Sequence, residues 1–139
     1  MNAKKFTLAT LGYVVVTFAL ALPWHLIWFK DSYHSLGVYN RENPIFAFGV
    51  GSMVLQGLIL AYLYPFFNIN KGTRPIFTGI RFGLLMGVFL WSVSVLALAA
   101  KVNMTSLSTF FTLSSLFHLI QFVAAGTLIG WIYGSNAER

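Results

Sequence analysis

The amino-acid sequence predicts an all-α integral membrane protein, an antiparallel up-down bundle of four transmembrane helices. Of the 139 residues, 58% are hydrophobic and only 9% are charged, whereas about one quarter of a soluble domain is charged. The apolar residues also gather into four runs, at about 6–29, 44–67, 76–100 and 107–133. Each run exceeds the roughly 20 residues that a helix needs to cross a bilayer. The connections between them are short, so we expect residues 1–139 to form one domain.

The basic residues predict the orientation of this bundle. The net charge is +6, but the charges are spread over loops and ends and form no basic face, so no nucleic-acid partner is predicted. With four spans, the two termini and the 68–75 loop share one side of the membrane. That side carries Lys4, Lys5, Lys71, Arg74, Arg81 and Arg139, and the other carries Lys30, Arg41 and Lys101. Basic loops stay in the cytoplasm, so both termini are expected there.

The first apolar run is expected to remain as a span. Lys4 and Lys5 before an apolar run suit a signal peptide, but the run continues to Phe29 and offers no small-residue cleavage site near Pro23. Pro23 lacks a backbone donor and predicts a kink near the outer end. Trp24 and Trp28 then fall where an aromatic belt is expected at the interface.

Two ladders of glycine at spacing four, a glycine zipper, predict the closest helix contact. Gly79, Gly83 and Gly87 lie in the third run, and Gly126, Gly130 and Gly134 lie in the fourth. Small residues allow helix backbones to approach closely in lipid. The two helices run in opposite directions, so both ladders fall at the same depth in the cytoplasmic half. Close packing of the third and fourth helices is therefore predicted.

The outer half instead carries bulky aromatic residues, which predicts a bundle that widens outward. We expect a cleft there, bordered by Trp24, His25, Trp91 and His118, with Gln56 and Gln121 at its floor. A mostly apolar cleft with a few convergent polar groups is the usual form of a small-molecule site. The alternative is a dry core, in which these side chains form interhelical hydrogen bonds worth about 0.6 kcal/mol each.

The sequence carries few signs of catalysis or of a cofactor. It has no cysteine, and no carboxylate lies at mid-membrane, where a proton-coupled exporter would place one. Asp31, His34 and Glu42 share the outer loop without a metal-binding spacing, so no metal site is predicted. A haem held by His25 and His118 is a remote alternative, because these residues differ in depth by about 9 Å. No cofactor is required by the sequence.

Four segments resemble those of small bacterial four-span inner-membrane proteins of unknown function. They are Pro23-Trp24-His25, Gln56-Gly57-Leu58, Leu63-Tyr64-Pro65 and the stretch from Arg81 to Gly87. The resemblance runs over most of the chain. It implies a bacterial inner membrane and transfers no activity, ligand or functional residue.

Two functions follow as the main hypotheses. The first is a structural or accessory subunit, which packs on a membrane-protein complex or on copies of itself. The sequence leaves enzymatic activity open, although the scarcity of catalytic groups favours a role without catalysis. The second is a binding protein for a hydrophobic small molecule, such as a lipid, quinone or pigment, in the outward-facing cleft. Membrane lipids are the partners expected in either case.

Overall fold

Four long helices make up the computed structural model, which describes residues 2–38, 41, 43–67 and 74–134. In chain order the elements are α1 (Ala3–Pro23), the π-helical turn η1 (Trp24–Trp28), α2 (Lys30–Ser35), α3 (Phe46–Phe67), α4 (Pro75–Trp91), the π-helical turn η2 (Ser92–Leu96), α5 (Ala97–Ala99) and α6 (Leu107–Gly134). Four stretches are long and apolar enough to cross a membrane: Ala3–Trp28, Phe46–Phe67, Pro75–Ala99 and Leu107–Gly134. The all-α, four-helix prediction is confirmed.

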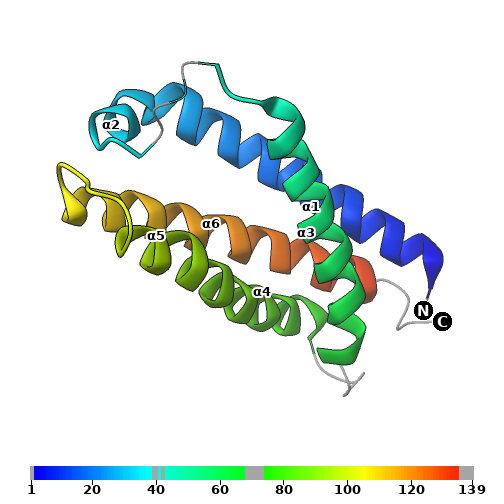
Figure 1. Cartoon of the computed structure of the whole chain (residues 1–139). Coiled ribbons are helices and arrows are strands. Elements are labelled where there is room, and N and C mark those ends of the chain that lie inside the picture. Colours follow the sequence, from blue (N-terminus) through cyan, green and yellow to red (C-terminus); the bar gives the residue numbers. More distant parts are fainter. Residues whose placement is uncertain (1, 39–40, 42, 68–73, 135–139) are drawn as a thin grey trace.

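Three of the long helices form a layer and the fourth crosses it. In Figure 1, α6 lies between α1 and α4, and α3 runs obliquely across these three helices. The start of α1 and the end of α6 lie at the same end, where Lys5 Nζ donates a hydrogen bond to the Tyr133 carbonyl at 2.8 Å. We call this the terminus end, and the opposite end the α2 end.

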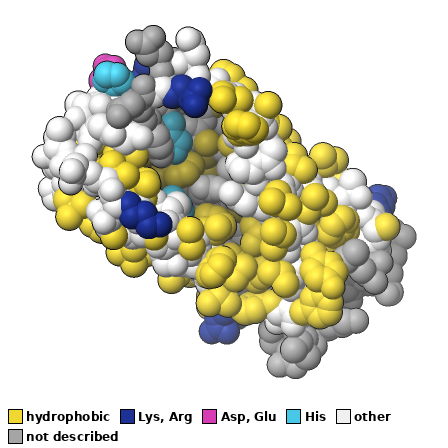
Figure 2. Space-filling model, in the orientation of Figure 1, with side chains coloured by type: hydrophobic (Ala, Val, Ile, Leu, Met, Phe, Trp, Pro, Cys, Tyr) yellow, Lys and Arg dark blue, Asp and Glu magenta, His cyan; other side chains and the backbone are white. Residues whose placement is uncertain are grey.

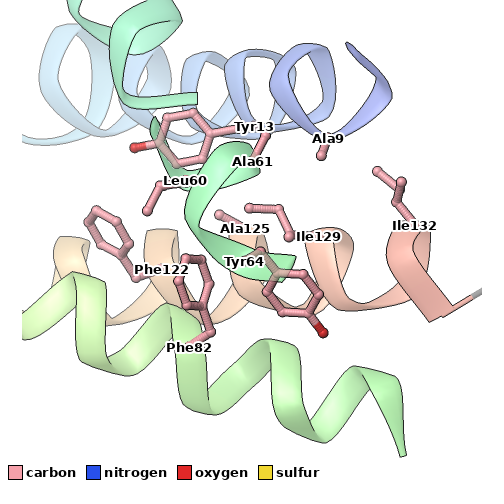
Figure 3. Close-up of a cluster of buried hydrophobic side chains, with 10 residues drawn as sticks. All are labelled: Ala9, Tyr13, Leu60, Ala61, Tyr64, Phe82, Phe122, Ala125, Ile129 and Ile132. Atoms are coloured by element: carbon pink, nitrogen blue, oxygen red, sulfur yellow. The ribbon is translucent and has the colours of Figure 1, made fainter. Parts of the chain in front are cut away.

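The core is divided into two clusters along the helices. The cluster in the terminus half takes side chains from all four long helices, as Figure 3 shows. Its members are Ala9, Tyr13, Leu60, Ala61, Tyr64, Phe82, Phe122, Ala125, Ile129 and Ile132. The cluster at the α2 end consists of Trp24, Tyr33, Leu36, Val95, Phe110 and Phe117. No buried member of this second cluster comes from α3, so α3 closes the bundle only in the terminus half.

The backbones of α4 and α6 approach most closely at the two glycine ladders. A Cβ atom added to Gly79 would lie 2.7 Å from the Gly130 Cα, and one added to Gly126 would lie 2.9 Å from the Gly83 Cα. Either distance is shorter than an ordinary van der Waals contact, which begins at about 3.4 Å. Larger residues would therefore force these helices apart. At the two ends of the ladders, Gly87 faces the Phe122 side chain and Gly134 faces that of Pro75.

Both π-helical turns lie toward the α2 end of their helices, and a proline at one and serine hydroxyls at the other account for them. Pro23 precedes η1 and has no N–H to donate along the helix. At η2, Ser92 Oγ donates to the Phe89 carbonyl and Ser94 Oγ donates to the Leu90 carbonyl, each at 2.7 Å. Such side-chain bonds compete with the backbone ladder and bend helices.

The α2 end differs from the sequence-based prediction in two respects. Part of the predicted polar loop forms the helix α2 and buries Tyr33, and Trp24 packs in the interior with an exposed fraction of 8%, so its side chain does not face the lipid. Trp28 is 67% exposed, as expected of a belt residue. Three residues used in the sequence arguments, Glu42, Lys71 and Arg139, lie outside the described residues.

Candidate functional site

A buried polar cluster joins α1, α3 and α6 at mid-depth. The Tyr13 hydroxyl donates to Gln56 Oε1 at 2.6 Å and accepts a hydrogen bond from Gln121 Nε2 at 3.1 Å. Gln121 Nε2 also donates to Thr17 Oγ1 at 3.4 Å. Tyr13, Thr17 and Gln121 are each at most 5% exposed. The two glutamines predicted as a cleft floor therefore meet through Tyr13, in a cluster whose hydrogen bonds hold three helices together.

His118 is fixed by hydrogen bonds at both ring nitrogens. Its Nδ1 lies 2.8 Å from the Ser114 carbonyl, one turn earlier on α6, and its Nε2 lies 2.8 Å from Ser94 Oγ on η2. The imidazole stacks on Phe122, with the ring centroids 6.2 Å apart. π-Helical turns inside α-helices are frequent at functional sites, and here the turn η2 carries the hydroxyl that reaches His118.

Trp91 and His118 line the same groove between α4 and α6. This groove has a volume of about 210 Å³, and its walls are Leu84, Gly87, Val88, Trp91, Ser115, His118, Leu119 and Phe122. Trp91 Nε1 donates to Ser115 Oγ at 2.9 Å. Trp91 and Ser115 lie eight residues from the helix limits at the α2 end, Ala99 and Leu107, or about 12 Å along the helix axes. The groove is thus polar toward the α2 end and apolar toward the middle of the spans.

The second predicted pair, Trp24 and His25, lies on η1. Trp24 Nε1 donates to the Tyr33 hydroxyl at 3.3 Å, and the His25 ring packs against Tyr33 and Phe117 with centroid separations of 4.9 and 4.5 Å. Tyr33 lies outside the spans. Burial raises the pKa of its phenol above the usual value near 10, against smaller opposing effects of hydrogen bonds with Ser114 and Trp24.

His25 also borders a cavity of about 160 Å³ between the first span and α3. Its walls are Phe18, Ala21, Leu22, His25, Leu26, Phe46, Gly49, Val50 and Met53. On the face shown in Figure 2, the molecule is hollowed between α3 and the α2 end, and histidine side chains are visible inside the hollow. The hollow lies where α3 no longer covers the layer of α1, α6 and α4.

The six predicted site residues therefore fall into three groups. Trp91 and His118 share the groove, Gln56 and Gln121 share the polar cluster, and Trp24 and His25 share η1. Phe117 links two of these groups, because its ring packs against the imidazoles of both His25 and His118. That arrangement does not suit the haem alternative, in which both imidazoles would face one iron across an open space.

Sequence reasoning missed three residues of this region. Ser115 contacts Trp91, Phe117 packs between the two histidines, and Tyr33 covers Trp24. One signal was available on α6, because Ser114, Ser115 and His118 lie within one turn of each other in an apolar run. Nothing in the sequence indicated that Tyr33 folds inward.

Comparison with known proteins found no match for this chain among family models, curated proteins or solved structures. The fold and composition define it as a small multi-pass membrane protein.

Proposed function

We propose that this protein binds an amphipathic small molecule, taken from the bilayer, in the groove between α4 and α6. One observation carries the proposal: the polar groups of the groove converge at the end nearer to α2, while the rest of its wall is apolar. A molecule with a polar head and an apolar tail has the same division. Its head would lie beside Trp91, Ser115 and His118, and its tail along Leu84 and Phe122.

The size of the groove limits the occupant. Pockets for drug-sized molecules measure about 300–1,000 Å³, and this groove measures about 210 Å³. A single narrow chain fits such a space better than a fused ring system or a lipid with two chains. Leu119 and Val88 are 52% and 64% exposed at the groove walls, which supports entry from the side, through the lipid phase.

Photo-crosslinking tests this function. The probes are decanol and decanoate, each with a diazirine at the last carbon, added to the protein in nanodiscs. With the head beside Trp91, the tail would run about 10 Å toward Leu84, which lies seven residues away on α4. We expect saturable labelling of α4 and α6 near Leu84 and Phe122, competed by the unlabelled amphiphile.

A matched pair of variants provides the control. Leu84 lines the groove, whereas its neighbour Leu85 is not among the groove residues and is 53% exposed. Leu84→Phe should fill the groove and abolish saturable labelling, and Leu85→Phe should leave it unchanged. Labelling that does not saturate, or that is equal in the two variants, would mean that the probes report only the surrounding lipid.

The alternative function is that of an accessory subunit, and the first half of α3 favours it. Residues 46–52 are all exposed, and a Cβ atom added to Gly49 or Gly51 would meet nothing within 4 Å. A helix of a partner protein, or of a second copy of this chain, would fit against these small residues. The mass of the complex extracted in a mild detergent tests this alternative: a mass of one chain plus detergent would refute it.

The membrane and the orientation are part of the same proposal. We infer that the protein lies in a bacterial inner membrane with both termini in the cytoplasm, since basic residues are more numerous on the terminus side.

A further inference from the structure

The contacts of Ser94 and His118 determine how many protons the site must hold. Ser94 Oγ lies 2.7 Å from the Leu90 carbonyl and 2.8 Å from His118 Nε2, and His118 Nδ1 lies 2.8 Å from the Ser114 carbonyl. The two carbonyls can only accept hydrogen bonds, and a serine hydroxyl has one proton to donate. Each short contact requires a proton between its two atoms.

Neither neutral tautomer of His118 supplies enough protons. With the proton on Nδ1, the Ser94 hydroxyl must serve both the Leu90 carbonyl and Nε2 with a single proton. With the proton on Nε2, the Nδ1 lone pair faces the Ser114 carbonyl. The imidazolium satisfies all three contacts: Nδ1–H donates to Ser114, Nε2–H donates to Ser94, and the Ser94 hydroxyl donates to Leu90.

A charge at this position needs a counter-charge, because an unpaired charge in the spans is costly. The acidic side chain among the described residues is Asp31, which is exposed on α2. The titratable group that faces His118 from η1 is His25, whose ring contacts the same Phe117. From α1, Tyr13 packs against Phe122, on which the His118 ring stacks, and its hydroxyl is bonded to Gln56 and Gln121. Residues 84–96 of α4 and η2 present no titratable group.

We therefore expect at most one of the two histidines, His25 or His118, to be protonated at a time. Two imidazolium groups on one phenylalanine would repel each other, and like charges disfavour double protonation. Ser115 adds a neutral donor at the same end of the groove. Its Oγ accepts from Trp91, and within the described residues its own proton is not used in a second hydrogen bond.

We propose that His118 is held as an imidazolium when the groove is occupied, and that the occupant is a single-chain amphiphile with an anionic head, of the fatty-acid class. The carboxylate pairs with the His118 charge and accepts a hydrogen bond from Ser115. This inference rests on the proposed function and names the chemical class of its ligand. In the empty groove this charge has no partner, so in slightly alkaline solution the unliganded protein gives up the proton. Binding of a carboxylate takes one proton up again, which restores the second N–H bond of His118.

Proton uptake on binding laurate tests the inference, with dodecanol as the uncharged probe of equal length. In a weakly buffered, slightly alkaline solution, laurate should bind with uptake of up to one proton, and dodecanol with none. The infrared spectrum of the bound laurate should show an ionised carboxylate. His118→Gln should abolish the uptake and weaken laurate binding about 10- to 100-fold, the usual worth of a charge-assisted contact, and it should weaken dodecanol binding less than laurate binding, because the alcohol has no charge to pair. His25→Gln should retain the uptake.

The outcomes separate this inference from the function on which it rests. Equal affinities for laurate and dodecanol, or proton uptake that persists in His118→Gln, would overturn the inference and leave amphiphile binding standing. A protonated carboxyl in the infrared spectrum would overturn it as well. If neither probe binds saturably, the proposed function fails and the inference with it. An unchanged circular dichroism spectrum of His118→Gln in detergent shows that the variant is folded.

Discussion

The substitution Gly126→Ala tests how closely α4 and α6 pack, through its effect on the free energy of unfolding. The added Cβ atom would lie 2.9 Å from the Gly83 Cα and 3.1 Å from the Gly79 carbonyl carbon. Ordinary contacts begin at about 3.4 Å, so the two backbones must separate by at least about 0.5 Å. Neither neighbour can yield by rotating a side chain, since both are backbone atoms. Overpacking of this kind costs about 1–3 kcal/mol.

Gly49→Ala provides the matched control. Alanine stabilises a helix relative to glycine by about 0.5–1 kcal/mol, and this gain applies to both variants. At Gly49 the added Cβ atom meets nothing within 4 Å, so the gain stands alone. The difference in the free energy of unfolding between the two variants therefore isolates the overpacking, and we expect Gly126→Ala to be the less stable by about 1–3 kcal/mol.

Equilibrium unfolding in mixed micelles with increasing sodium dodecyl sulfate, followed by tryptophan fluorescence, gives both free energies. Equal stability of Gly126→Ala and Gly49→Ala would refute the reasoning, because it would mean that α4 and α6 tolerate a side chain between them.

Three further predictions concern the polar cluster, α2 and the orientation. A double-mutant cycle of Tyr13→Phe and Gln56→Leu should give a coupling of about 0.6 kcal/mol in the free energy of unfolding. A coupling of zero would mean that the hydrogen bond between these side chains does not stabilise the protein. Burial raises the pKa of Tyr33, so its contribution to stability is complete below pH 10 and is lost as the pH rises through the folded-state pKa. The difference between the ultraviolet titrations of wild type and Tyr33→Phe should show this late ionisation. Reporters fused to either terminus should be active in the cytoplasm, and a periplasmic terminus would contradict the charge argument.

The sequence predicted those features of the fold that follow from composition and spacing. The four helices follow from the length of the apolar runs. In lipid, a single span can hydrogen-bond all its backbone N–H and C=O groups internally only as a helix. The glycines at spacing four lie where α4 and α6 meet, since they are the positions at which a backbone can approach. Both patterns are local along the chain and need no knowledge of the loops.

The features that were not predicted depend on tertiary contacts or on small departures from α-helical geometry. Trp24 was expected as a lipid-facing anchor, but Tyr33 and Phe117 enclose its side chain. No periodic pattern in the sequence indicates that α2 folds back over the bundle. The turn η2 contains no proline. It carries the Ser94 hydroxyl that contacts His118.

The central claim is that the groove between α4 and α6 holds an amphiphile. Native mass spectrometry of the protein extracted from its membrane tests this claim most directly. We expect an adduct of one single-chain amphiphile, which is lost in Leu84→Phe and retained in Leu85→Phe. An unmodified mass for the wild type, or an adduct that is equally abundant in both variants, would contradict the claim.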